Sequence, residues 1–388
     1  MKNKIIYFIV IFLFWRFLLF TAGLAADKVV KYEPSFPNVQ QLKQSQTIRA
    51  IYSWGNFDGV HYLTIAEKGY VGTGLIQAFF PGYPLTIKLI NIFLSNLLVS
   101  GLLVSNLFFF FDLIVFYKLV KLDWSNKTAN FSIIFLLLFP TSFFFVGLYS
   151  ESIFLFFVLM SFYFARKKRW GWASTFVALA SFTRIIGVFL VPALLVELWL
   201  QNNSQNLQTM LQRNWQKLVI ILLGSTGLIA YMTYLKYTFD DPLFFYHLQS
   251  EFGAGRQESI ILLPQVIWRY LKIMATARPI DFKYLSYVQE FVYSLFALSA
   301  LLLSIKKIRF SYLIFSIFAW ILPTLTGTFS SMPRYILVCF PIYIWLALFA
   351  GKLWNRISGK IFIIHCLVAL STLLCLNLIL FLQGHWVA

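Results

Sequence analysis

Long apolar runs, separated by short charged connections, fill most of this sequence. An apolar run of about 20 residues is typical of a helix that crosses the roughly 30 Å hydrocarbon layer, because each helical residue rises about 1.5 Å. The pattern predicts helices at residues 5–24, 78–97, 98–118, 128–147, 150–165, 170–184, 185–200, 218–236, 287–305, 310–328, 335–350 and 361–382. It therefore predicts an all-α polytopic membrane protein, with residues 1–388 forming a single transmembrane domain.

Composition and charge agree with this prediction. Hydrophobic residues make up 60% of the sequence and charged residues 12%, whereas about a quarter of a soluble domain is charged. The net charge is +18, and basic residues gather in short connections, most clearly at 166–169, 306–309 and 352–360. Cytoplasmic loops carry such an excess of Lys and Arg, so the charge indicates topology and no nucleic-acid partner. The three cysteines lie inside apolar runs without metal-ligand spacing.

With the basic connections in the cytoplasm, two long polar connections, 25–77 and 237–286, lie on the external or lumenal side. The first apolar run resembles a signal peptide, but its length favours a retained first helix. Twelve crossings that start inside would end inside, whereas residues 383–388 follow a helix that should end outside. Proline and glycine interrupt the segment 79–97, so we expect that segment not to cross. About eleven spans, within a range of ten to twelve, remain.

An aromatic frame surrounds a carboxylate in the first long connection. The sequence WGNFDGVHY at 54–62 is followed by IAEKGY at 65–70 and FFPGYP at 79–84. These motifs resemble the first lumenal loop of the GPI mannosyltransferase II family and its bacterial relatives. The resemblance implies a GT-C architecture and a polyprenyl- or dolichyl-phosphate sugar donor. The family usually has Trp-Asp where this chain has Phe57 and Asp58, so the aromatic character is kept and its identity is not.

The motif provides the candidate catalytic residue, Asp58. A partly desolvated carboxylate at the membrane surface suits a general base that deprotonates an acceptor hydroxyl, although Asp before Gly also caps helices and turns. His61 would orient the acceptor or Asp58, or be a surface histidine without a role. The rings of Trp54, Tyr62 and Tyr83 would stack on sugars at the interface.

Four further residues are candidates for substrate binding. Glu151 lies in a Tyr-Ser-Glu-Ser turn similar to one in the family; it would bind sugar hydroxyls, hold a basic residue or face a helix dipole. Arg184 and Arg334 match arginines of the family pattern and offer planar donors to a phosphate, or are helix-end arginines that snorkel. His247 would contribute to the donor site.

The sequence assigns no metal and no cofactor. Asp240 and Asp241 precede a proline, and such a pair more often forms a turn than a cation site, so metal dependence stays open. Nucleotide-binding, serine-hydrolase and zincin motifs are absent from the sequence. Two alternatives remain: a multi-span transporter or lipid flippase, which would show repeated halves and midplane charges, and an inactive scaffold of the same fold.

We therefore expect an inverting glycosyltransferase, in the first place a mannosyltransferase. It would move a sugar from a polyprenyl- or dolichyl-phosphate to a hydroxyl of a glycan or glycolipid on the external or lumenal face. Its partners would be this donor, that acceptor and membrane lipids, whereas the sequence does not specify the acceptor, the linkage or any protein partner. A compact chain without a recognisable retention signal favours a bacterial plasma membrane over the endoplasmic reticulum.

Overall fold

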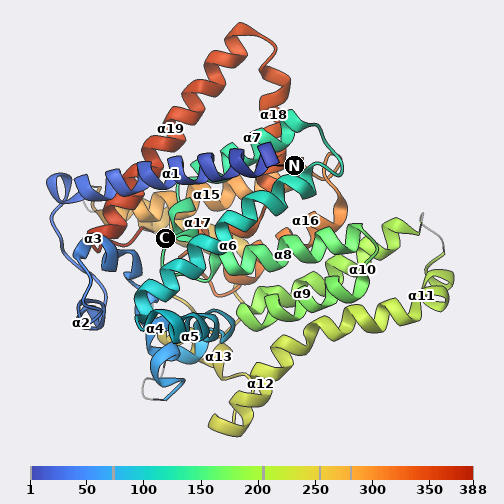
Figure 1. Cartoon of the computed structure of the whole chain (residues 1–388), viewed down its shortest axis with the longest axis horizontal. Helices are drawn as coiled ribbons and strands as arrows, with labels where there is room; N and C mark the ends of the chain where they lie inside the picture. The colour runs from blue at the N-terminus through green and yellow to red at the C-terminus, as the bar shows by residue number, and fades with distance from the viewer. Residues whose placement is uncertain (1, 72–74, 203–205, 253–254, 280–281, 388) are drawn as a thin grey trace.

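The computed structural model describes residues 2–71, 75–202, 206–252, 255–279 and 282–387 as an all-helical bundle, without a β-strand in these ranges (Figure 1). Five helices in the described ranges are long and apolar enough to cross a membrane: Lys4–Val29, Leu97–Val120, Gln212–Phe239, Phe282–Leu303 and Ile357–Leu382. Met332–Val338 and Pro341–Leu353, bent by 78° to each other, qualify together as a broken span or a re-entrant loop. The chain is a polytopic membrane helix bundle, as predicted.

Successive helices run between two ends of the bundle. We call the end with the connections 121–125, 167–169, 304–309 and 354–356 the basic end, and the opposite end, where residues 30–57 lie, the loop end. The passes are α1 (Lys2–Val29), α6 (Leu97–Val120), α7 (Asn126–Leu138), α8 (Glu151–Arg166), α9 (Trp170–Thr183), α10 (Leu190–Gln201), α11 with α12 (Leu207–Leu222 and Thr226–Phe239), α15 (Phe282–Leu303), α16 (Phe310–Thr324), α17 with α18 (Met332–Tyr335 and Pro341–Leu353) and α19 (Ile357–Leu382). Several passes have fewer than 18 residues, so the count of eleven membrane crossings stays a prediction.

Helix α5 (Gly82–Leu94) stays at the loop end. At its start, a Cβ on Gly82 would lie 2.9 Å from the Cα of Thr183, at the end of α9. Beyond its other end, the side chain of Asn96 donates a hydrogen bond of 3.0 Å to the carbonyl of Ser45. With 13 residues, α5 is also shorter than a span. That residues 79–97 do not cross the membrane stays a prediction.

Two predicted helices are broken. The predicted helix 128–147 ends at Leu138, and Phe139 is extended because the residue before a proline, here Pro140, disfavours the α conformation. The predicted helix 335–350 is interrupted at Cys339, which is not helical, and α18 then begins at Pro341. As a result, two irregular segments, 139–150 and 336–340, lie in the interior of the bundle.

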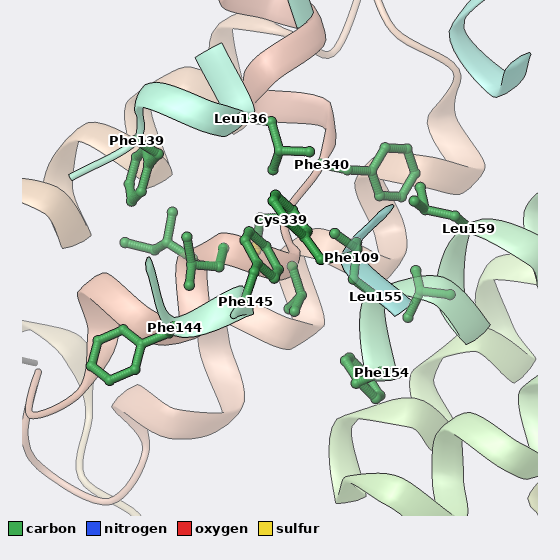
Figure 2. Packing of buried hydrophobic residues seen from close by; sticks show 14 of the residues in the cluster. Phe109, Leu136, Phe139, Phe144, Phe145, Phe154, Leu155, Leu159, Cys339 and Phe340 are labelled. Atoms are coloured by element: carbon green, nitrogen blue, oxygen red, sulfur yellow. The ribbon is translucent and has the colours of Figure 1, made fainter. Parts of the chain in front are cut away.

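The apolar core surrounds these irregular segments, as Figure 2 shows. The ring of Phe109 in α6 stacks on Phe145 with 4.6 Å between centroids. Phe340 packs edge-on against Phe162 in α8, at 5.6 Å, and Cys339 is fully buried beside it. Because lipid tails are as apolar as these side chains, close packing rather than removal from water holds the helices together.

The long connections contain short helices. The first one starts after Val29 and carries α2 (Val39–Lys43), α3 (Arg49–Tyr52) and α4 (Asp58–Lys68); the second runs from the end of α12 to α15 and carries α13 (Phe244–His247) and α14 (Leu263–Thr276). Residues 383–387 contact the first connection and α15. Ser35 N–H donates to the carbonyl of Gly384 at 2.9 Å, and Ser286 Oγ donates to the carbonyl of Trp386 at 2.6 Å. This segment ties the first connection to α15.

Candidate active site

A cavity of about 1190 Å³ lies at the loop end. Its walls come from the first connection, α4, α13 to α17 and the segment 383–387. Five of the residues predicted from the sequence line it: Asp58, His61, Tyr62, Arg184 and Arg334. Side chains that are far apart in the sequence therefore share one site.

A strained turn positions Asp58 at the start of α4. The preceding residue, Phe57, has φ 59°, a left-handed conformation that costs a residue with a Cβ about 1–3 kcal/mol. Its ring packs against Phe36 at 4.7 Å and against Trp386 at 5.4 Å. This packing keeps Phe57 in the strained conformation and so fixes the place of the carboxylate.

Asp58 belongs to an alternating chain of charges. Its Oδ2 accepts a hydrogen bond of 2.5 Å from Arg334 Nη1. Arg334 Nε lies 3.4 Å from Oε1 of Glu151, and the same oxygen accepts a bond of 2.6 Å from Arg184 Nη1. The side chain of Glu151 is only 1% exposed, so pairing with two arginines offsets the cost of burying its charge.

Aromatic rings hold the two arginines in place. The guanidinium of Arg334 lies 5.3 Å from the ring of Tyr149 and 5.5 Å from that of Tyr335. Arg184 lies over the same Tyr335 ring at 5.3 Å. Such cation–π contacts contribute about 0.5–2 kcal/mol each. Ser331, three residues before Arg334, has φ 65°. A residue in a left-handed conformation therefore precedes Arg334, as Phe57 precedes Asp58.

The pKa values of Asp58 and His61 are both lowered, which favours the charged form of Asp58 and the neutral form of His61. Burial alone would raise the pKa of Asp58, but the charge of Arg334, together with that of His61 at the low pH where His61 is protonated, outweighs it and holds that pKa below the usual 3.8. Burial lowers the pKa of His61 below 6.5, although Asp58 opposes the shift. At neutral pH, Asp58 is therefore ionised and His61 neutral. His61 stacks on Phe79 at 4.9 Å.

Two aromatic residues that the sequence suggested for sugar stacking lie behind the cavity wall. The Tyr83 hydroxyl hydrogen-bonds the carbonyl of Gly101 at 3.0 Å and Ser105 Oγ at 2.7 Å. Trp54 is 3% exposed, with the Arg16 guanidinium 4.6 Å from its ring. α5 directs Tyr83 towards α6, and neither ring lines the cavity, so the structure does not place them against a sugar. Tyr62 does line it.

The acidic and histidine residues after α12 are not part of the cavity lining. His247 Nδ1 lies 2.6 Å from Asp241 Oδ2, and this bond lowers the pKa of Asp241. Asp240 binds Lys236 at 2.5 Å. The two adjacent acids thus have different partners. Within the residues that the structure describes, no three His, Cys, Asp or Glu side chains gather as metal ligands.

The cavity lining also contains polar residues that were not predicted from the sequence: Arg256, Arg269, Tyr270, Glu290 and Trp386. Glu290 had a usable signal, because an acid inside an apolar run of spanning length is a functional candidate. The others lie in irregular connections or on an amphipathic helix, where no pattern distinguishes them from surface residues.

A membrane helix bundle with an ionised carboxylate in an aromatic-lined cavity belongs to the class of polytopic membrane proteins that bind polar substrates at the membrane boundary. Comparison with known protein families narrows this class. The family described as mannosyltransferase (PIG-V) matches residues 2–241, which is more than half of the chain. The chain belongs to this family and is a glycosyltransferase. No curated protein matches the sequence.

Proposed function

We propose that this protein transfers a mannosyl unit from a polyprenyl-phosphate donor to a hydroxyl of a glycan or glycolipid acceptor, on the external face of the membrane and with inversion at the anomeric carbon. The observation that carries the proposal is the ionised Asp58 in the wall of the 1190 Å³ cavity at the loop end. Family membership supplies the sugar, and the basic connections at the opposite end support the external orientation.

In this reaction Asp58 is the general base. The acceptor oxygen forms a bond to the anomeric carbon while the bond from that carbon to the phosphate oxygen breaks. The acceptor proton passes to the Asp58 carboxylate, and polyprenyl phosphate leaves with the bonding electron pair. Arg334 fixes the carboxylate at 2.5 Å, so the base is oriented before substrate enters. Its low pKa keeps Asp58 unprotonated between turnovers.

Arg184 and Arg334 are held by carboxylates rather than standing open to a phosphate. A guanidinium has five N–H donors, and the ion pairs with Glu151 and Asp58 use only part of them. We propose that these arginines stabilise the negative charge that develops on the departing phosphate. His61, neutral and beside Asp58 in the cavity lining, then hydrogen-bonds the acceptor.

The test is transfer of radiolabelled mannose from polyprenyl-phosphate mannose into a membrane lipid extract by the purified protein in liposomes. Asp58→Asn keeps the size of the side chain and removes the base. We expect it to lower the rate about a hundredfold or more, the scale of a general base. Asp240→Asn makes the same change at a carboxylate that is 92% exposed and outside the cavity, and should leave the rate unchanged.

Equal rates for the wild type and Asp58→Asn would remove Asp58 as the base. An absence of transfer by the wild type, with the protein folded by thermal melting, would count against the polyprenyl-phosphate donor itself. In that case transport of labelled lipid across the liposome membrane would favour the flippase alternative.

A further inference from the structure

The cavity contains a second carboxylate that the proposed chemistry does not use. Glu290 of α15 lines it and is 1% exposed. Its Oε2 accepts a bond of 2.6 Å from the Tyr270 hydroxyl. Its Oε1 accepts longer bonds from Trp386 Nε1, at 3.3 Å, and from the backbone N–H of Ser331, at 3.4 Å. These three donors are uncharged, whereas Asp58 and Glu151 each accept a hydrogen bond from an arginine; the charge of Arg256, in the same cavity lining, also acts on Glu290.

Glu290 and its hydrogen-bond donors lie next to Asp58. Helix α17 links them, because Ser331 N–H meets Glu290 at its start and Arg334, one turn later, holds Asp58. A ring contact links them as well, since Trp386 packs edge-on against Phe57, the residue before Asp58, at 5.4 Å. A ligand in the cavity can therefore touch both carboxylates.

The surroundings of Glu290 fit a hydroxylated ligand better than a purely structural role. A carboxylate has about four acceptor positions, and bonds of 3.3 and 3.4 Å lie beyond the usual 2.7–3.2 Å range. Oε1 thus retains capacity for stronger donors. Burial of the Glu290 carboxyl group is costly even though the charge of Arg256 acts on it, and hydroxyl groups of a ligand would offset part of that cost. Trp386 and Tyr270, both in the cavity lining, provide apolar ring surface next to it.

We propose that Glu290, Tyr270 and Trp386 form a sugar subsite that holds the acceptor next to Asp58. This inference rests on the proposed function. Glu290 accepts hydrogen bonds from hydroxyls of the acceptor sugar, and the Trp386 ring packs on its C–H face. The subsite is a positioning device, because it places the attacking hydroxyl at Asp58 without taking its proton. All three residues lie outside the matched family region, 2–241.

A binding experiment tests the subsite independently of transfer. The probe is octyl α-D-mannopyranoside, titrated calorimetrically into the protein in lipid nanodiscs, so that no sugar-headed detergent competes. Loss of a charged hydrogen-bond acceptor weakens binding about tenfold or more. We therefore expect Glu290→Gln to raise the dissociation constant by at least about tenfold, and Trp386→Phe, which keeps a smaller ring, to raise it less. Tyr293→Phe, the matched control, removes a buried hydroxyl of α15 outside the cavity lining and should leave it unchanged.

Kinetics separate positioning from chemistry. For Glu290→Gln, we expect a KM for the acceptor extract that is raised about tenfold, an unchanged KM for the donor and a kcat within about threefold of wild type. For Asp58→Asn, we expect the reverse: a lost kcat and retained binding of octyl mannoside.

Two results would overturn the subsite. One is equal binding of octyl mannoside by wild type and Glu290→Gln, or no binding by the wild type. The other is a Glu290→Gln enzyme with a kcat lowered a hundredfold and an unchanged acceptor KM, because Glu290 would then act in the chemical step. A wild type that binds octyl mannoside through Glu290 but transfers no mannose would refute the donor assignment and not the subsite.

Discussion

Asp58 and Arg334 are 276 residues apart in the sequence and 2.5 Å apart in the structure, Oδ2 to Nη1. The side chain of Arg334 is 8% exposed and that of Asp58 20%. Their pairing joins the first connection to α17 and places a carboxylate and a guanidinium side by side in the cavity lining. The contact is therefore structural and functional at once, and the two roles can be separated by mutation.

Removal of Arg334 should cost more stability than removal of its partner's charge. Arg334→Met leaves two carboxylates, Asp58 and Glu151, in a buried place with one cation fewer. Breaking such a pair costs about 3–5 kcal/mol. We expect the free energy of unfolding to decrease by this amount, as measured by denaturant titration in micelles.

The double variant provides the control for this prediction. Asp58→Asn combined with Arg334→Met should be more stable than the sum of the single changes predicts, because each change removes the unpaired charge that the other one leaves. Strict additivity would show that the 2.5 Å contact contributes no coupling energy.

His61 should make the protein less stable in mildly acidic solution. Its pKa in the folded protein is below 6.5, so the unfolded chain binds a proton first as the pH falls. The contribution of His61 to stability therefore decreases as the pH falls below about 6.5, until the folded His61 is itself protonated. Asp58 does not titrate in this window, because its pKa lies below 3.8. As the pH falls from 8 to 5, the melting temperature of the wild type should decrease relative to that of His61→Gln. Equal slopes would contradict the assignment.

Tyr83 and Tyr62 should respond differently to loss of the hydroxyl. Tyr83→Phe removes the bonds to Gly101 and Ser105, and Ser105 Oγ keeps its bond to the Tyr149 carbonyl, so the cost is that of lost buried hydrogen bonds, about 0.5–1.5 kcal/mol each. We expect lower stability and an unchanged acceptor KM. Tyr62→Phe changes a residue of the cavity lining whose hydroxyl hydrogen-bonds Ser150 Oγ at 3.0 Å, and should alter the acceptor KM. An altered acceptor KM in Tyr83→Phe would indicate that Tyr83 belongs to the substrate site.

At the basic end, Glu197 should be a purely structural residue. It is fully buried and accepts hydrogen bonds from Arg309 Nε at 2.6 Å and from Ser311 Oγ at 2.7 Å. Glu197→Gln leaves the arginine unpaired and should lower the free energy of unfolding by about 3 kcal/mol. The rate per folded molecule should not change. Glu67→Gln, at an exposed position on α4, is the matched control and should be neutral in both measurements.

The sequence was sufficient for the helical class and for much of the path of the chain. Apolar runs defined the long helices, and Pro81, Gly82 and Pro84 marked the segment that stays at one end. The signals at Pro140 and Pro341 were also present. However, the apolar pattern extends across both prolines, so the lengths of two helices were overestimated.

The site itself was only partly predictable. The local motif indicated Asp58, and an arginine next to apolar runs indicated Arg184 and Arg334. The sequence left open that Glu151 holds a basic residue, but sequence patterns do not tell which charges meet, so the pairing of Asp58 with Arg334 was not foreseen. An aromatic motif likewise does not tell which side of a short helix faces the cavity. Tyr83 and Trp54 therefore entered the prediction, and Glu290 and Trp386 did not.

The return of residues 383–387 to the first connection has a consequence for biosynthesis. A ribosome delivers Asp58 to the membrane long before Arg334, and Trp386 later still. Until then, the carboxylate lacks its counter-ion and Phe57 lacks one of the rings that hold its strained turn. A nascent chain thus stays without a formed substrate pocket until α17 and α19 have been inserted. Chains inserted only up to an earlier helix should be recognisable by a first connection that proteases still cut.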